Sequence, residues 1–297
     1  MTVTQVSYHG WPHSYVIANG IVEAVVVPSI GRVMQLRRAG HTDGVFWENR
    51  SLDGQLHDLA PKEWKNFGGD KCWPAPQSGW PEQQGHAWPP PAPFDARPLQ
   101  AVVADSGVTL ASPIDPDYGI GFVRRVELDP RAPVMRIQTR FHKISGAPVR
   151  VAVWTITQMR DPERIFMFVP ETTKFAEGYV RLIESEPKEL RRQGRLLSLA
   201  RNPRADAKIG TEASSLLWVG PSEAVRIDTE RVPGEYPDHG SVTEVYTNSD
   251  PLPYVELETL SPLADMKAGD CITHTTVYTL MPRSSADPES EARKVFG

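Results

Sequence analysis

The sequence lacks the features that mark several large protein classes. It has only two cysteines, Cys72 and Cys271, which form neither a CxxC pair nor a disulfide framework. We therefore expect a protein that is stabilised by its core in a reducing, cytoplasmic compartment. No run of 18 apolar residues is present, and the N-terminal segment has no charged stretch followed by an apolar one. We expect neither a membrane span nor a secretory signal.

Basic charge is also scarce, since 32 Lys and Arg stand against 37 Asp and Glu for a net charge of −5. A protein that neutralises phosphates needs a basic face, so nucleic acid is not an expected partner. The sequence contains no GxSxG, no Walker loop and no GxGxxG after a strand, which removes the usual basis for serine or nucleotide chemistry. The eight histidines form no cluster with the cysteines, so we expect no metal site and no cofactor.

Proline, in contrast, is abundant: the chain has 28 in 297 residues, about twice the usual share of ~5 %. Eight of them fall between Pro74 and Pro98. Because proline lacks an N–H group and clashes inside helices, we expect this stretch to form neither a helix nor a central strand. Its aromatic residues would be out of place in a disordered linker. We predict an ordered functional loop over residues 61–98, within a single domain that covers residues 1–297.

Most of the remaining sequence has the pattern of short β-branched strands separated by turns. The expected strands are Ile21–Val27, Arg32–Leu36, Leu99–Val103, Val108–Ser112, Gly121–Leu128, Val134–Phe141, Val149–Met159, Tyr179–Glu184, Leu196–Ala200, Leu216–Val219, Ala224–Thr229, Tyr254–Leu260 and Cys271–Leu280. A C-terminal helix is expected over Asp287–Phe296, with Asp287 as N-cap and Pro288 in the first turn. Many strands without helices between them exclude a parallel α/β sheet. They predict an all-β fold, a large two-layer antiparallel β-sandwich.

The first candidate site is the segment NFGGDKCWPAPQ, residues 66–77. Its two glycines allow a tight backbone turn, its polar side chains can bind hydroxyl groups, and tryptophan faces suit the C–H faces of a sugar ring. The substrate-binding candidates here are Asn66, Asp70, Trp73, Gln77, Trp80 and Trp88, and Lys71 is a catalytic candidate. The alternative is a structural loop that caps the core, with Asp70 and Lys71 as a local ion pair.

The second candidate site is the expected strand around Pro253–Leu263. Side chains alternate along a strand, so Glu256 and Glu258 share one face, about 7 Å apart after two steps of ~3.3 Å. In a cleft, their repulsion would raise the pKa of one carboxyl and prepare an acid or a base. On an open solvated face they would add only solubility. His274 would join them if its strand pairs with theirs, and is otherwise a structural histidine.

Four segments carry a family resemblance. The C-terminal stretch YVELETLSPLADMKAGDCITHTTVYTL resembles the end of galactose mutarotase-like proteins, the aldose 1-epimerases and their relatives. The segment NGIVEAVVVPSIGRVMQLRRAG is similar to their opening hairpin. The segments GGDKCWPAPQSGW and VAVWTITQM resemble an uncharacterised branch of that superfamily. The resemblance extends over nearly the whole chain and implies a β-supersandwich that binds a small carbohydrate.

The resemblance also implies a mechanism. In the epimerases a glutamate on a late strand is the base for the anomeric hydroxyl; Glu256 matches it best, and Glu258 is the rival. A histidine on a mid-chain strand is the acid for the ring oxygen, but the corresponding strand here, residues 151–158, has no histidine. Either another group is the acid, or the protein binds sugar without epimerising it. The replacement acids to consider are Lys71, Asp70 and His274, and further substrate-binding candidates are Trp154, Gln158 and Arg32.

Three functions remain open: an enzyme acting on a carbohydrate, a non-catalytic carbohydrate-binding or sensing protein, and a lyase or isomerase of a non-sugar polyol. One acid or base group contributes roughly 10²–10⁴-fold to a rate. We therefore predict weak or absent mutarotation of glucose and galactose, together with measurable binding of a sugar or sugar acid. We also predict that Asp70 and Lys71 lie beside Glu256, and that Trp73 and Trp88 stack on the ligand.

Overall fold

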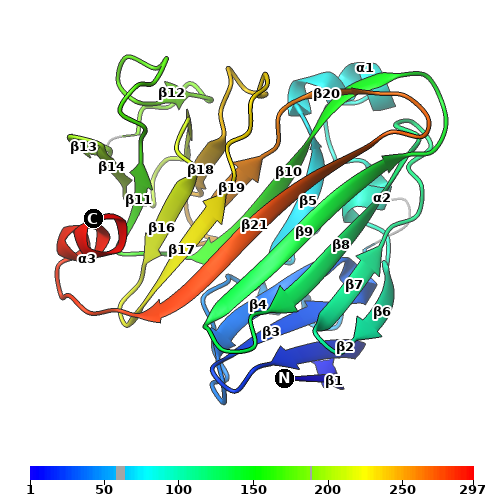
Figure 1. The fold of residues 1–297 in the computed structure, drawn as a ribbon, viewed down its shortest axis with the longest axis horizontal. Helices are drawn as coiled ribbons and strands as arrows, with labels where there is room; N and C mark the ends of the chain where they lie inside the picture. Colours follow the sequence, from blue (N-terminus) through cyan, green and yellow to red (C-terminus); the bar gives the residue numbers. More distant parts are fainter. Residues whose placement is uncertain (58–63, 188) are drawn as a thin grey trace.

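Two antiparallel sheets face each other across the molecule (Figure 1). The computed structural model describes residues 1–57, 64–187 and 189–297. In spatial order, the first sheet contains β1 (Thr2–Tyr8), β2 (Trp11–Ala18), β3 (Val22–Val27), β4 (Arg32–Arg38), β5 (Asp70–Ala75), β10 (Val149–Arg160), β19 (Tyr254–Leu260), β18 (Thr243–Thr247), β15 (Ala207–Thr211) and β12 (Val180–Arg181), with β20 (Ala264–Met266) also paired to β10. The second contains β13 (Arg191–Gln193), β14 (Leu196–Leu199), β11 (Arg164–Phe168), β16 (Ser215–Val219), β17 (Glu223–Thr229), β21 (Cys271–Pro282), β9 (Val134–Lys143), β8 (Ile120–Leu128), β7 (Gly107–Ala111) and β6 (Gln100–Ala104).

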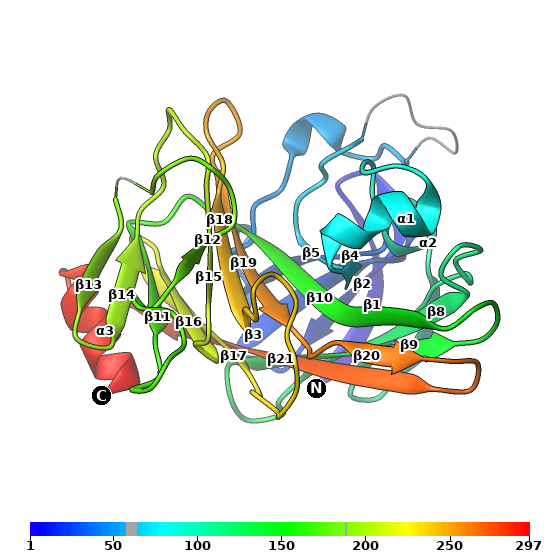
Figure 2. The same cartoon turned by 90° about the horizontal axis from the view of Figure 1, so that it is seen from above.

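Helices are short and lie outside the two sheets. They are the 3₁₀ turns η1 (Pro28–Ile30), η2 (Arg50–Leu52) and η3 (Gln77–Gly79) and the α-helices α1 (Trp80–Gln84), α2 (Ala92–Asp95) and α3 (Pro288–Phe296). Figures 1 and 2 show α1 and α2 close to β5, and α3 on the opposite side of the molecule beside β11 and β16. As predicted, Asp287 caps α3 by accepting a hydrogen bond from the backbone N–H of Ser290.

The core lies between the sheets. One apolar cluster includes Val126 of β8, Val153 of β10 and Leu257 of β19, so side chains from both layers interdigitate. Strand β9 alternates between buried and exposed residues, as expected when one face of a strand is solvated. In β10, however, every residue from Val151 to Met159 is buried. The chain therefore also covers the outer face of the first sheet at β10, and polar side chains on this face are partly shielded from water.

The predicted all-β sandwich is confirmed. Of the expected strands, Tyr179–Glu184 is the least accurate, because only Val180–Arg181 pairs. Strands β1, β2, β5, β11, β13, β15, β18 and β20 were not predicted from the sequence. Several of these are five or six residues long, and a short strand carries only two or three alternations by which to recognise it.

The prediction that Pro74–Pro98 excludes helices and central strands was wrong. Strand β5 lies inside the first sheet between β4 and β10, and α1 and α2 follow it. Pro74 is tolerated because the backbone of its partner Val153 bonds to Ser261 on the other side. Position 74 thus needs no N–H toward β10, and its carbonyl accepts a hydrogen bond from the indole of Trp80. Residues 61–63 of the predicted loop lie outside the described residues.

Candidate functional site

The central strands β5, β10 and β19 bring distant parts of the sequence onto one face. Ile156 of β10 lies between Lys71 of β5 and Glu258 of β19, and Gln158 pairs with Glu256. Residues of the opposite parity, such as Asp70, point between the sheets and contact the second layer. By alternation, Lys71, Gln158, Glu256 and Glu258 point to the outer face of the first sheet.

The centre of this face is a contact between Lys71, Gln158 and Glu256. The Nζ of Lys71 lies 3.4 Å from Oε1 of Glu256, and Nε2 of Gln158 donates to the same oxygen at 2.9 Å. No hydrogen bond from a described residue reaches Oε2 of Glu256. The Glu256 side chain keeps 14 % of its surface exposed, whereas Lys71 keeps 1 %. One carboxylate oxygen is therefore fixed by the protein, and the other is available to a ligand hydroxyl.

Lys71 is held in an aromatic and largely dry environment. Its ammonium lies 4.8 Å from the ring centre of Trp73 and 5.7 Å from that of Trp64. Burial lowers the pKa of Lys71, while the neighbouring Glu256 acts in the opposite direction. A lysine with a lowered pKa gives up its proton more easily than an exposed one, which is a requirement for a general acid.

Asp95 fixes the tryptophans around Lys71. Its carboxylate accepts hydrogen bonds from the indoles of Trp73 at 2.9 Å and Trp64 at 2.7 Å, and forms an ion pair with the buried Arg32 at 2.5 Å. Burial acts to raise the pKa of Asp95, but Arg32 and the other donors outweigh it and lower the pKa below the usual value. Trp88 packs on Trp64 at 5.1 Å and is 45 % exposed. The rings of Trp64, Trp73 and Trp88 form a tryptophan wall, and its outermost member, Trp88, is accessible.

A second charged group lies one step further along β19. The ammonium of Lys208 on β15 contacts Glu244 of β18 at 2.7 Å and Glu258 at 3.1 Å, and Trp154 donates its indole N–H to Glu258 at 2.6 Å. Burial raises the pKa of both carboxyls. Burial also acts to lower the pKa of Lys208, but the carboxylates of Glu244 and Glu258 outweigh burial and raise this pKa above its usual value. Since Glu244 and Glu258 are buried while Glu256 is accessible, Glu256 is the better candidate for contact with a ligand.

No family model and no curated protein sequence matches this chain, but solved structures do. A protein of Escherichia coli K12 proposed to be an aldose 1-epimerase aligns with a TM-score of 0.60 at 14 % identity, over 91 % of this chain and 99 % of that one. A galactose mutarotase-like protein of Lactobacillus casei aligns with a TM-score of 0.60 at 10 % identity, over 90 % and 100 % of the two chains. A galactose mutarotase related enzyme of Lactobacillus acidophilus aligns with a TM-score of 0.54 at 11 % identity, over 92 % of this chain and 98 % of that one.

The chain has the galactose mutarotase-like fold. The fold that the sequence resemblance implies is thereby confirmed, whereas the assignment to a branch with the GGDKCWPAPQSGW segment stays a prediction. Identities this low establish the fold alone, so the reaction has to be argued from the side chains on the mutarotase-like sheet.

Several predicted residues do meet on the outer face of this mutarotase-like sandwich. Lys71, Glu256, Glu258, Trp73, Trp154 and Gln158 lie on adjacent strands. Gln77 lines a cavity of about 400 Å³ together with Trp154 and Lys208. Asn66 is hydrogen bonded to Tyr254, which precedes Glu256 on the same face of β19.

Other predicted residues lie elsewhere, and these expectations are corrected. Asp70 points between the sheets, where it pairs with Arg124, so it does not lie on the pocket floor beside Lys71. Trp80 is fully buried and packs against Trp73 and Trp88, so it has no face for a ligand. Arg32 is neutralised by Asp95 and supports the tryptophan wall rather than an anionic ligand.

His274 is also absent from the site. Strand β21 pairs with β9 and β17, not with β19. The Nε2 of His274 lies 2.8 Å from Oγ1 of Thr259, whose side chain points to the face opposite Glu258. Burial lowers the pKa of His274 to about 4. His274 is therefore a neutral histidine between the sheets and not a replacement acid.

Three residues of this face, Asp95, Lys208 and Glu244, were not predicted from the sequence. The signal for Glu244 is the short strand Thr243–Thr247, in which the β-branched Thr243, Val245 and Thr247 share one face and Glu244 and Tyr246 the other. In the part of the chain that the structure describes, no group of three or more His, Cys, Asp or Glu side chains could hold a metal ion. No helix of the described residues is long and apolar enough to cross a membrane.

Proposed function

We propose that the outer face of the first sheet binds a sugar or sugar acid in its ring form, and that Glu256 and Lys71 exchange protons with it at the anomeric centre. The observation that carries this proposal is the accessible carboxylate of Glu256, fixed by Lys71 at 3.4 Å and Gln158 at 2.9 Å on a sheet of mutarotase-like fold. The tryptophan wall beside Lys71 supports the choice of ligand, because aromatic faces complement the C–H faces of a sugar.

In the proposed chemistry, Glu256 and Lys71 each transfer one proton when the sugar ring opens and reverse that transfer when it closes. Glu256 accepts the proton of the anomeric hydroxyl while the C1–O5 bond breaks, and Lys71 donates a proton to the ring oxygen. The open-chain aldehyde rotates about its C1–C2 bond. The two protons then return as the ring closes on the other face of the carbonyl, so no atom is gained or lost. Gln158 keeps the carboxylate of Glu256 oriented throughout.

A second candidate function is sugar binding without turnover. It is favoured by the direct contact between Lys71 and Glu256, because a charge pair that is already satisfied is a weaker acid and a weaker base than two separate groups. It is also favoured by the sequence of β10, which contains no histidine. Both candidates use the same ligand face and differ only in the rate of anomer exchange.

The proposal is tested by measuring anomer exchange and binding on the same proteins. Exchange is followed by polarimetry and by NMR of fresh α-glucose, α-galactose and galacturonic acid, and binding by saturation-transfer NMR and calorimetry. We expect Glu256→Gln to lower any catalysed exchange by 10²–10⁴-fold, with Lys71→Met giving a similar loss. Glu127→Gln, on β8 of the second sheet, is the matched control and should leave both properties unchanged.

The two candidates give different results. Catalysed exchange that is lost in Glu256→Gln identifies an epimerase. Binding that weakens in Glu256→Gln, without catalysed exchange in the wild type, identifies a sugar-binding protein. Binding or exchange that is the same in wild type, Glu256→Gln and Lys71→Met would show that the site is elsewhere.

A further inference from the structure

Two adjoining cavities lie beside the proposed sugar site, because Trp154 and Lys208, which line the first of them, contact Glu258 next to that site. The first, of about 400 Å³, begins at Trp154 and Lys208, and the second has a volume of about 640 Å³. Both are lined by Ser78, Asp238 and His239, so they are two parts of one cleft. Each part alone has the volume of a typical small-molecule site, about 300–1,000 Å³. The cleft is therefore larger than a single sugar ring requires.

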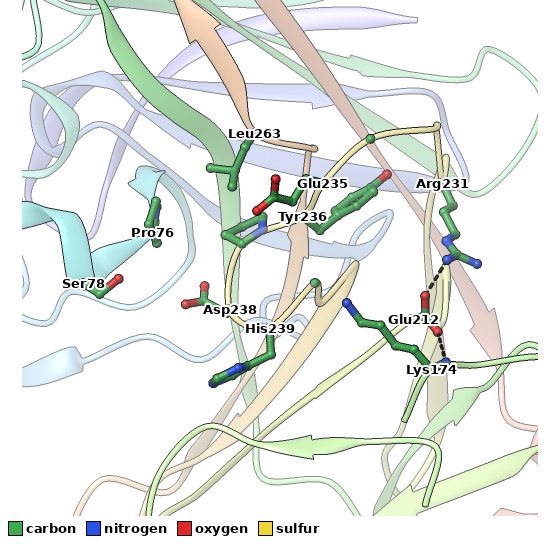
Figure 3. A pocket seen from close by; sticks show the side chains of 13 residues that line it. Pro76, Ser78, Lys174, Glu212, Arg231, Glu235, Tyr236, Asp238, His239 and Leu263 are labelled. Carbon is green, nitrogen blue, oxygen red and sulfur yellow. Dashed lines mark hydrogen bonds and ion pairs between the residues drawn. The ribbon is translucent and has the colours of Figure 1, made fainter. Parts of the chain in front are cut away.

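The cleft has two facing walls (Figure 3). Pro76 and Ser78 follow β5 on one side, and the segment from Glu235 to Gly240 forms the other. Asp238, His239 and Gly240 have φ angles of 50°, 63° and 89°. Left-handed backbone is uncommon outside glycine, and strained residues of this kind cluster at ligand sites. Figure 3 shows Asp238 and His239 on the side of their turn that faces Ser78.

The far end of the cleft contains a lysine, Lys174, that forms no ion pair with any described residue. Lys174 extends toward the turn that carries His239 (Figure 3), and a Cβ at Gly240 would lie only 1.8 Å from its Nζ. No ion pair to Lys174 Nζ arises from the described residues, whereas the neighbouring Arg231 is paired with Glu212 at 2.5 Å. The carboxylate of Asp238 likewise has no ion-pair partner in the described parts of the chain. The Nζ of Lys174 lies 5.1 Å from the ring centre of Phe175, but neither this ammonium nor the Asp238 carboxylate has a hydrogen-bond partner among the described residues.

We infer that this cleft is a second sugar subsite, and that the natural ligand is an oligosaccharide rather than a free monosaccharide. This inference rests on the proposed function. The terminal ring of the oligosaccharide lies at Glu256 and Lys71, and the oligosaccharide continues over Trp154 into the cleft. The next ring packs on Tyr236, with hydroxyl groups bonded to Asp238, His239 and Lys174. The mixture of apolar faces with separate donors and acceptors is the pattern that a polyhydroxylated ring requires.

The test compares monosaccharides with disaccharides that contain them. Calorimetry on the full chain is performed with glucose, maltose and cellobiose, with galactose, lactose and melibiose, and with galacturonic and digalacturonic acid. We expect at least one disaccharide to bind tenfold or more tightly than its monosaccharide. His239→Gly and Lys174→Met should remove most of this gain and leave monosaccharide binding unchanged. Glycine at position 239 is compatible with the positive φ, so folding should be preserved.

His13→Gly is the matched control, because His13 has a φ of 56° on β2, far along the sheet from the cleft. It should retain the full disaccharide gain. Equal affinities for monosaccharides and disaccharides, with both lost in Glu256→Gln, would refute the subsite and leave the proposed function intact. A disaccharide gain that survives in both His239→Gly and Lys174→Met would also refute it. Absence of binding by every sugar in the panel would overturn the proposed function and the subsite together.

Discussion

Neighbouring residues on a strand have opposite roles in this protein, and Asp70 and Lys71 are the clearest case. Lys71 points to the outer face and contacts Glu256 at 3.4 Å. Asp70 points inward and pairs with Arg124 on the other sheet. A dipeptide that looks like one charged unit in the sequence is divided by the alternation of a strand. Of the two residues predicted to lie beside Glu256, only Lys71 does so, because their segment forms a strand and not a loop.

The buried His274 predicts a pH dependence of stability. Its pKa falls from 6.5 in the unfolded chain to about 4 in the folded one, because the site is dry. Between these two values the unfolded state binds the extra proton. The free energy of unfolding should therefore fall as the pH drops from about 6.5 to about 4, and the full contribution is present above pH 6.5. The shift corresponds to roughly 3 kcal/mol at 1.36 kcal/mol per pKa unit.

Urea unfolding at pH 7.5 and pH 4.5 measures this effect. His274→Gln should show a smaller loss of stability on acidification than the wild type, whatever its stability at pH 7.5. The difference between the two proteins separates His274 from the other titrating groups. The exposed His41 provides the control His41→Gln, which should behave as the wild type. Identical pH dependence in wild type and His274→Gln would contradict the assignment of a neutral His274.

Strand β5 determines where Lys71 lies, and two glycines lead into it. Gly68 and Gly69 have φ angles of 90° and 72°. A Cβ at Gly68 would lie 2.2 Å from the carbonyl oxygen of Trp47. The chain can therefore enter β5 in this register only with glycine at position 68. Because β5 carries Lys71 and Trp73, a displaced strand also displaces the centre of the candidate site.

We predict that Gly68→Ala is much more costly than Gly20→Ala. Both positions have left-handed backbone, but a Cβ at Gly20, with a φ of 84°, would meet nothing within 4 Å. Gly20→Ala should lose only the backbone strain, about 1–2 kcal/mol. Gly68→Ala adds overpacking of about 1–3 kcal/mol and should weaken sugar binding as well. Urea unfolding and calorimetry give the two quantities; equal losses of stability in both variants would argue against a close approach at Gly68.

The two layers of the whole molecule are joined by a buried polar cluster. Asp70 of β5 pairs with Arg124 of β8 and accepts hydrogen bonds from Thr157 of β10 at 2.8 Å and Tyr278 of β21 at 2.7 Å. Two sheets thus contribute to one network that contains no exposed member. Removal of one charge from such a pair leaves the other buried without compensation.

Asp70→Asn should therefore lower the free energy of unfolding by about 3–5 kcal/mol. The double variant Asp70→Asn with Arg124→Met should be more stable than Asp70→Asn alone, since it no longer buries an isolated guanidinium. Glu235→Gln removes the exposed pair with Arg150 and should change stability by no more than ~1 kcal/mol. Denaturant melts of the four proteins test this, and a double variant no better than the single one would exclude a penalty from unpaired Arg124.

The sequence by itself determined what depends on local pattern. Alternating apolar residues specify strands, their number without intervening helices specifies a sandwich, and Asp287 with Pro288 specifies the start of α3. The shared face of Glu256 and Glu258 also follows from spacing alone. These features need no knowledge of distant residues, because each is set by the geometry of one strand or one helical turn.

Only the tertiary structure decided which strands are neighbours. The contact of Lys71 with Glu256 spans 185 residues, and the group of Lys208, Glu244 and Glu258 depends on the pairing of β15, β18 and β19. Strand pairing also decides the position of His274, because its predicted strand, Cys271–Leu280, does not pair with the strand of Glu256, and its side chain faces the core. Strand pairing results from the burial of both faces of the whole sheet, a property of the complete chain that no local segment encodes.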